Sequence, residues 1–379
     1  MNKKSFLNTP LIGVNNGASL IQTPALIIDL DKFEANQALM QRYCDQANIR
    51  LRPHTKTHKC VEIAKRQISN GGQGICCAKL GEAETMAAGG ISDILITSPV
   101  VSPLGIDRLI NLSRATDITV VVDSLRNVEM IADASLRSDV RINLLLDLDP
   151  GLHRTGVPPD NRAEAIAISI SEHKHLEFRG LQMYAGHLMH IRSFQERRTK
   201  SLQALEMMEA FRNRLLGIGI ECPIMTGGGT GTVNIDPEAE ILNEIQAGSY
   251  LFMDRQYNEI EDSDKGRLPF ATSLFVQTTV ISTNHPNLCT TDAGLKAFAT
   301  DDKTPILAER NDPSINYFFF GDEHGGIRWE GNDSFEVGRW LRAETPHCDP
   351  TFNLYNVVHV IQGSRLVAVW EIEGRGKSA

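Results

Sequence analysis

A repeated strand-then-helix unit is the feature of this chain that most limits its possible folds. Short apolar runs are each followed by a segment with apolar residues at helical spacing. The expected strands cover residues 25–30, 49–53, 74–78, 94–97, 118–123, 142–149, 178–184 and 223–226. Such alternation implies a parallel sheet, and eight units of about 28 residues match the size of a (β/α)8 TIM-type barrel. An open doubly wound sheet is the alternative, which the count of eight units disfavours.

The chain is longer than a barrel needs. It has 379 residues, whereas a single barrel takes about 250. Beyond residue 268 the pattern changes to strands separated by turn signals. These strands are expected at residues 271–281, 288–292, 315–320, 335–343, 356–361 and 366–370. We therefore expect two domains, a barrel over 23–262 and an all-β domain over 265–379 that part of 1–22 joins.

Charge and cysteine content exclude several classes of protein. The net charge is −9 and no block of Lys and Arg is visible, so a nucleic-acid partner is not expected. No apolar run approaches the ~18–20 residues that span a bilayer, so neither is a membrane. The first residues hold two lysines but no apolar stretch, unlike a signal peptide. Seven cysteines without a pairing framework indicate a reducing compartment, and we expect the cytoplasm.

A basic segment follows the second expected strand. Residues 52–59 read RPHTKTHK, at the end of the strand where barrels carry their active sites. A lysine there can be desolvated and act as an amine nucleophile or Schiff-base partner. A solvated basic loop is the alternative interpretation.

A glycine-rich segment follows the last expected barrel strand. Residues 226–232 read TGGGTGT, and glycines allow backbone N–H groups to converge on an anion. Phosphate sites in barrels recur after strands seven and eight. Residues 246–250, QAGSY, could add phosphate donors. A plain flexible turn is the alternative for either segment.

Four further residues could take part in chemistry. On an extended strand His347 and Asp349 would share one face. That pair suits a divalent ion such as Mn²⁺ or Mg²⁺, with water at the open positions, although a hydrogen bond between the two is an equal alternative. Arg154 follows a strand end and could bind an anionic cofactor oxygen. His190 lies past the seventh strand and is a candidate proton carrier.

A lysine nucleophile, a phosphate cradle and an arginine on one barrel rim describe a pyridoxal 5′-phosphate site. The chain resembles the fold-type III pyridoxal-phosphate enzymes of the alanine racemase group, and within it the D-threonine aldolase and 3-hydroxy-D-aspartate aldolase branch with its D-serine-dehydratase-like C-terminal domain. The motifs that carry the resemblance are RPHTK at 52–56, GICC at 74–77, TGGGTG at 226–231, QAGSYLFMD at 246–254, DAGLK at 292–296, DEHG at 322–325 and HCDPT at 347–351.

The resemblance assigns roles to residues of this chain. It implies that Lys56 is the Schiff-base lysine. It implies phosphate contacts from Thr230, Gly248 and Ser249, other cofactor contacts from Arg154, Tyr184 and Tyr257, and metal ligation by His347 and Asp349. The chain departs from the branch at Ala78, where a cofactor-binding Gln is usual, and at Ala185, where a polar residue is usual.

The leading functional hypothesis is retro-aldol cleavage of a small-molecule D-3-hydroxy amino acid to glycine and an aldehyde. The metal would lower the pKa of the β-hydroxyl, His190 or a metal-bound hydroxide would take its proton, and Lys56 would return a proton to Cα.

Four other activities compete with this hypothesis. The nearest is D-serine-dehydratase-type β-elimination to a 2-oxo acid and ammonia, which the carboxylate of Asp349, in place of a cysteine ligand, disfavours. Racemisation, a non-catalytic cofactor carrier and a metal-dependent hydrolase explain less of the chain. A homodimer is expected from the resemblance.

Overall fold

One of the two sheets is a closed parallel barrel. The computed structural model describes residues 6–263, 266–301, 303–308, 312, 314–331 and 334–379. Eight parallel strands follow the order β2-β9-β8-β7-β6-β5-β4-β3. Their bounds are β2 Arg50–Leu51, β3 Ile75–Cys77, β4 Ile94–Ile96, β5 Ile118–Val122, β6 Ile142–Leu148, β7 Leu176–Met183, β8 Ile224–Gly227 and β9 Glu244–Ile245. A parallel bridge between His54 and Cys76 joins the outer strands, so the sheet closes. The expected TIM-type barrel is confirmed.

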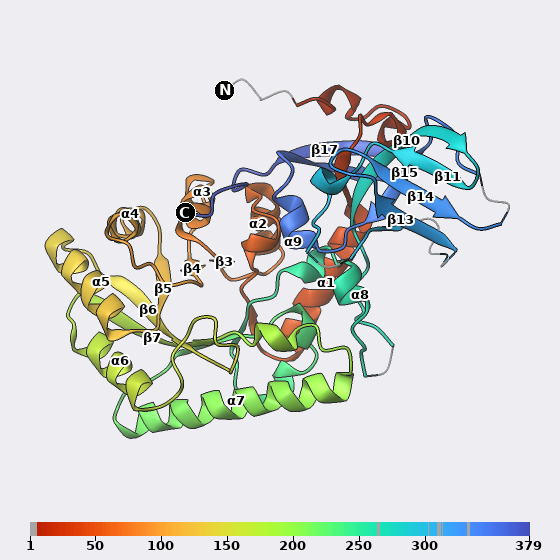
Figure 1. The fold of residues 1–379 in the computed structure, drawn as a ribbon. Helices are drawn as coiled ribbons and strands as arrows, with labels where there is room; N and C mark the ends of the chain where they lie inside the picture. The colour runs from red at the N-terminus through yellow and green to blue at the C-terminus, as the bar shows by residue number, and fades with distance from the viewer. Residues whose placement is uncertain (1–5, 264–265, 302, 309–311, 313, 332–333) are drawn as a thin grey trace.

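Helices cover the outside of the barrel (Figure 1). They are α2 Val61–Ser69, α3 Leu80–Ala88, α4 Pro103–Ser113, α5 Leu125–Ser138, α6 Asn161–Glu172 and α7 Phe194–Gly217. Serine side chains cap three of them, because Ser102, Ser124 and Ser193 each accept from the backbone N–H three residues on. An apolar cluster between these helices and the strands forms the larger core of the barrel.

The barrel interior is built by alternate residues of each strand. Cys76, Leu95, Val121, Leu145 and Ile224 form one apolar layer inside it. Two residues further along, the corresponding residues are polar in four of these five strands, Thr97, Asp123, Asp147 and Thr226, while the fifth has Ala78. The strands therefore present a polar layer at their carboxyl ends, where a parallel barrel holds its ligands.

The second sheet has nine strands and is mostly antiparallel. Its strands are β1 Ala25–Asp29, β10 Leu274–His285, β11 Leu288–Thr291, β12 Ile306–Leu307, β13 Ile315–Phe319, β14 Gly325–Trp329, β15 Trp340–Glu344, β16 Val357–Gln362 and β17 Arg365–Glu371. Two short helices, α8 Arg255–Asn258 and α9 Cys348–Phe352, lie at its junction with the barrel. Residues 6–22 lie against β17, where the Gly13 N–H donates to Leu366 O at 2.9 Å.

The first expected barrel strand was assigned to the wrong sheet. Residues 25–29 pair with β10 and β16 of the second sheet. The eighth barrel strand is instead β9, whose Glu244 points inward and pairs with Arg52 at 2.8 Å. A domain boundary at residue 23 therefore places β1 in the wrong unit, while residues 1–5 and the boundary residue 265 lie outside the described part of the chain.

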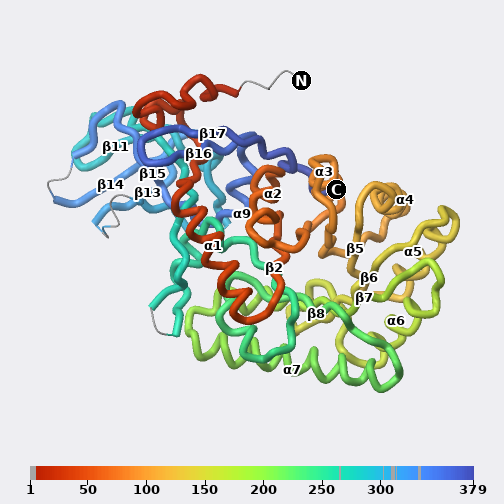
Figure 2. The backbone as a smooth tube through the Cα atoms, turned by 180° about the vertical axis from the view of Figure 1, so that it is seen from behind, coloured from red at the N-terminus to blue at the C-terminus, as the bar shows by residue number. Residues whose placement is uncertain are grey.

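Helix α1 (Leu30–Gln46) joins the two units (Figure 2). It contacts both β16 and β2, and Phe33 at its start lies 6.0 Å from the ring of Phe252. One apolar cluster contains residues of both sheets, so the second domain is fixed against the barrel mouth. In the described residues, no helix is long and apolar enough to cross a membrane.

Candidate active site

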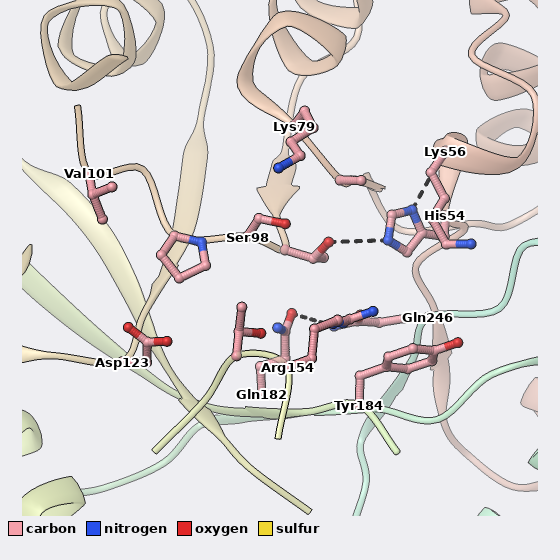
Figure 3. A pocket seen from close by; sticks show the side chains of 14 residues that line it. His54, Lys56, Lys79, Ser98, Val101, Asp123, Arg154, Gln182, Tyr184 and Gln246 are labelled. Atoms are coloured by element: carbon pink, nitrogen blue, oxygen red, sulfur yellow. Dashed lines mark hydrogen bonds between the residues drawn. The ribbon is translucent and has the colours of Figure 1, made fainter. Parts of the chain in front are cut away.

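A cavity of about 580 Å³ opens at the carboxyl ends of the barrel strands (Figure 3). Its lining comes from the ends of β2 to β7 and from the segment after β9. Lys56, Arg154 and Tyr184 of the expected site all line it. The structure therefore brings these three residues together at one cavity, and their roles remain predictions.

Lys56 lies in a single 3-10 turn, Thr55–Thr57, directly beyond β2. Its ammonium forms an ion pair with the Asp349 carboxylate of the second domain. Burial alone would lower the pKa of Lys56, but the Asp349 carboxylate outweighs this effect and raises it. Burial would likewise raise the pKa of Asp349, but Lys56 and then His347 hold it well below its usual value. The amine is thus held as a cation beside a carboxylate.

His54 fixes the turn that carries Lys56. Its Nδ1 accepts from the Lys56 backbone N–H at 3.4 Å, and its Nε2 lies 3.2 Å from Thr97 Oγ1. Burial, followed by the nearby Lys56 charge, holds the pKa of His54 well below its usual value, so the ring is neutral. A neutral ring that accepts at Nδ1 carries its hydrogen on Nε2, which donates to Thr97. The two strands β2 and β4 are thereby tied together under the lysine.

The two expected phosphate segments meet beside the turn that carries Lys56. The Tyr250 N–H donates to Thr230 Oγ1 at 3.0 Å, which joins the glycine-rich segment to the one after β9. Within the described residues, the buried N–H groups of Gly248 and Ser249 donate to no protein acceptor. The Thr57 hydroxyl is also buried without a partner. Because buried donors are nearly always paired, this cluster fits an absent anionic group such as a phosphate.

The backbone of Gly248 lies too close to its neighbours to carry a side chain. A Cβ added at Gly248 would overlap Thr57 Oγ1 and lie 2.9 Å from His54 O. The backbone φ of Gly248 is −128°, so its conformation alone does not demand glycine. The missing side chain therefore serves close approach rather than an unusual turn.

The side chains of Arg154 and Tyr184 pack on each other in the lining of the cavity. The guanidinium carbon of Arg154 is 5.3 Å from the centroid of the Tyr184 ring, within the range of a cation–π contact. Asp149 shapes the preceding loop, because its Oδ1 accepts from the N–H groups of Gly151 and His153. This loop conformation positions the Arg154 guanidinium over the Tyr184 ring.

The polar layer forms the base of the cavity. Gln246 Nε2 donates to Gln182 Oε1 at 3.0 Å, and Gln182 Nε2 donates to Asp147 Oδ1 at 3.1 Å. Thr155 Oγ1 donates to the other oxygen of Asp147 at 2.9 Å. Burial raises the pKa of Asp147 to about 6. This chain of hydrogen bonds links strands β6, β7 and β9 beneath Arg154.

The rings of Tyr257 and His190 lie next to each other. Their ring centroids are 4.6 Å apart. Tyr257 is buried, whereas His190 is exposed, and neither is among the described residues that line the cavity. The structure therefore pairs these two expected residues with each other. Their roles remain predictions.

The segment with His347 and Asp349 is helical at Asp349, not extended as the sequence suggested. His347 is the N-cap residue of α9, without a side-chain capping bond, and Asp349 is the second residue of the helix. Pro350 is compatible with this helix because proline is tolerated in the first turn. The Cys348 N–H donates to Asp254 Oδ2 at 2.8 Å, and Phe352 packs on Phe252 with centroids 4.8 Å apart. These contacts fix α9 over the barrel mouth, so Asp349 reaches Lys56.

The geometry around His347 is compatible with metal binding. His347 Nδ1 lies 2.7 Å from Asp301 Oδ2, as in metal sites where a carboxylate orients a ligating imidazole. Within the described residues, no group of three or more His, Cys, Asp or Glu is arranged to hold a metal ion. His347 and Asp349 would therefore share a metal with water or substrate oxygens, as a hard divalent ion allows.

Several polar or charged cavity residues were not identified from the sequence. Lys79, Ser98 and Asp123 line the cavity one or two residues beyond the ends of β3, β4 and β5. Their positions relative to the strand ends were the available signal, since side chains there face the mouth of a barrel.

Comparison with known proteins agrees with this geometry. Residues 28–256 match the alanine racemase N-terminal domain family, and residues 273–361 match a serine dehydratase domain family. The chain is 38% identical to a D-threonine aldolase of Arthrobacter sp over 94% of both chains. It is 35% identical to a 3-hydroxy-D-aspartate aldolase of Paracoccus denitrificans, over 95% of this chain and 93% of the relative.

The solved structures give the same result. The D-threonine aldolase from Filomicrobium marinum superposes with a TM-score of 0.91 at 33% identity, over 95% of this chain and 97% of that chain. By sequence, two related dehydratases match over 62% and 65% of this chain. The solved structure of the D-threo-3-hydroxyaspartate dehydratase from Delftia sp. HT23 superposes over 93% of this chain with a TM-score of 0.82, at 25% identity. The expected resemblance is therefore confirmed.

Proposed function

The chain belongs to the alanine racemase N-terminal domain family, and from that premise we propose that it is a pyridoxal-phosphate- and divalent-metal-dependent lyase that cleaves a D-3-hydroxy amino acid to glycine and an aldehyde. The observation that best supports this activity is the contact between Lys56 and Asp349. It brings the expected cofactor-binding amine and an expected metal ligand together at one cavity.

The cofactor would be held from three sides. Lys56 Nζ would bond to its aldehyde carbon, the cluster of Thr230, Gly248 and Ser249 would bind its phosphate, and Arg154 with Tyr184 would contact its ring. Tyr257 would add a further contact to the cofactor. When bound, pyridoxal phosphate supplies an electron sink for the bond cleaved at Cα.

The metal would be held by His347 and Asp349, and a histidine with a carboxylate favours Mn²⁺ or Mg²⁺. A metal there would polarise the β-hydroxyl of the substrate. The chain's own groups then need to move two protons. His190 would take the hydroxyl proton as the aldehyde forms, and Lys56 would deliver one to Cα, so that glycine leaves with its protons balanced.

The products distinguish this reaction from its nearest rival. Incubation with D-threonine and Mn²⁺ is expected to release glycine and acetaldehyde in equal amounts, measured by amino-acid analysis and an alcohol dehydrogenase assay. Release of 2-oxobutanoate and ammonia would instead establish a dehydratase. Heat-inactivated protein with the same metal and cofactor is the control for non-enzymatic cleavage.

The Gly248→Ala variant tests the phosphate cradle. Its added methyl group overlaps Thr57 Oγ1, so we expect the Kd for pyridoxal phosphate to rise by about tenfold, the cost of disturbing a charge-assisted contact. The measurement is equilibrium ultrafiltration of apoprotein with the cofactor. Gly217→Ala is the matched control, since a Cβ there meets open space. Equal affinities in the two variants would mean that the phosphate binds elsewhere.

Homodimer formation and a cytoplasmic location are part of the same proposal. The described cysteines are free thiols, which suits a reducing compartment. Exposed apolar side chains of Val101 and Leu104 lie beside the cavity mouth on the loop before α4 and on α4 itself. Such a patch suits coverage by a second subunit.

A further inference from the structure

Lys79 is a cation in the cavity that the proposed function does not use. It lines the same cavity as Lys56, and Figure 3 shows its ammonium directed into the open space. Among the described residues, no acceptor or carboxylate lies within bonding distance of its Nζ. By contrast, Lys56 is paired with Asp349, and Arg154 lies against the Tyr184 ring.

The surroundings of Lys79 favour an anion. Lys79 is the N-cap residue of the nine-residue helix α3, and its exposed ammonium, which has no acceptor, makes no capping bond. The N-terminus of α3 adds a partial positive charge. The Ser98 hydroxyl lines the same part of the cavity, and within the described chain it has no hydrogen-bond partner either. Two donors, the Lys79 ammonium and the Ser98 hydroxyl, therefore line one volume.

Neighbouring residues define this volume. Ala78 lines the cavity next to Lys79, and its short side chain leaves room there. The nearest competing charge in the lining is Asp123, whose Oδ2 accepts from the Gly156 N–H at 3.1 Å. In Figure 3, Asp123 lies on the opposite side of the space from Lys79. The phosphate segments come from β8 and β9, a different part of the rim, so Lys79 is not part of the phosphate cradle.

We propose that Lys79, with Ser98, binds a carboxylate of the amino-acid substrate. This inference rests on the proposed function, because it needs an amino acid whose amine is held at Lys56. An ammonium and a hydroxyl are a suitable donor pair for a carboxylate. The carboxylate is either the one on Cα or one at the end of a dicarboxylic side chain, and the ligands of the experiment separate these two.

The test is isothermal titration calorimetry of the cofactor- and Mn²⁺-loaded protein with D-aspartate and D-asparagine. Neither ligand has a 3-hydroxyl group, so neither can be cleaved, and they differ only by the charge of the side-chain end. Lys79→Gln is expected to weaken D-aspartate binding by about tenfold. Weakening of both ligands assigns Lys79 to the α-carboxylate, whereas weakening of D-aspartate alone assigns it to the side-chain carboxylate.

Two control variants make the result specific. Lys174→Gln removes the same charge before β7, at the opposite end of the barrel, and should change neither affinity. Lys79→Arg keeps the charge and should retain most of the binding. If Lys79→Gln binds both ligands as tightly as the unaltered protein, the inference is wrong. Failure of the unaltered protein to show a cofactor absorbance band would overturn the proposed function instead.

Discussion

Replacing Lys56 by alanine is expected to lower kcat by about 10⁴-fold, because the variant loses both the amine proposed to hold the cofactor and the acid proposed to protonate Cα. The absorbance band of the bound cofactor near the visible edge should disappear or shift in the same variant. Far-ultraviolet circular dichroism checks that the variant is folded. A folded variant without the absorbance band has lost the covalent attachment of the cofactor.

Lys59→Ala is the matched control for this prediction. Lys59 lies three residues beyond Lys56, but its Nζ is 3.4 Å from both Asn353 Oδ1 and Ser378 Oγ, away from the cavity. Its replacement should leave kcat within about twofold, because the half-buried Lys59 side chain is not part of the cavity lining. An unchanged absorbance band in Lys56→Ala would show that another amine holds the cofactor, and the proposed site would be wrong.

The fold was predictable from the sequence because the strand-then-helix repeat fixes the sheet type. The error concerned which eight strands close the barrel. Residues 25–29 are buried and apolar, a pattern that a barrel strand and a strand of the second sheet share. Strand β9 has only two residues, and one of them is the charged Glu244. It therefore lacks the apolar pattern by which the other barrel strands were predicted. The inward position of Glu244 makes sense only once Arg52 is seen opposite at 2.8 Å.

The candidate site was predictable where a local motif marks it. Lys56 and the glycine-rich segment follow strand ends directly, so sequence position alone put them on one rim. Lys79 and Ser98 lack such a motif, because a single lysine after a strand is commonly a solvated residue. Their shared cavity becomes visible only when the strands are closed into a barrel. The helix α9 was missed because five residues are too few to show helical periodicity.

Removal of the metal is expected to reduce activity by about 10²–10³-fold, the usual cost of losing one electrostatic stabiliser of a developing oxyanion. Dialysis against EDTA should produce this loss, and Mn²⁺ should restore the rate. Asp349→Ala alone is not a sufficient test of the metal site, because it also removes the carboxylate that pairs with Lys56.

His347→Ala isolates the metal from the lysine. His347 contacts Asp301, so its loss should lower the bound metal measured by mass spectrometry while the cofactor absorbance band stays. Activity should fall as it does in EDTA, and addition of EDTA to the variant should cause no further loss. A variant that keeps its Mn²⁺ and its rate would contradict the assignment of His347 as a ligand. Because Asp301 would orient the imidazole rather than bind the ion, Asp301→Ala should weaken Mn²⁺ binding by a smaller factor than His347→Ala, about 10-fold.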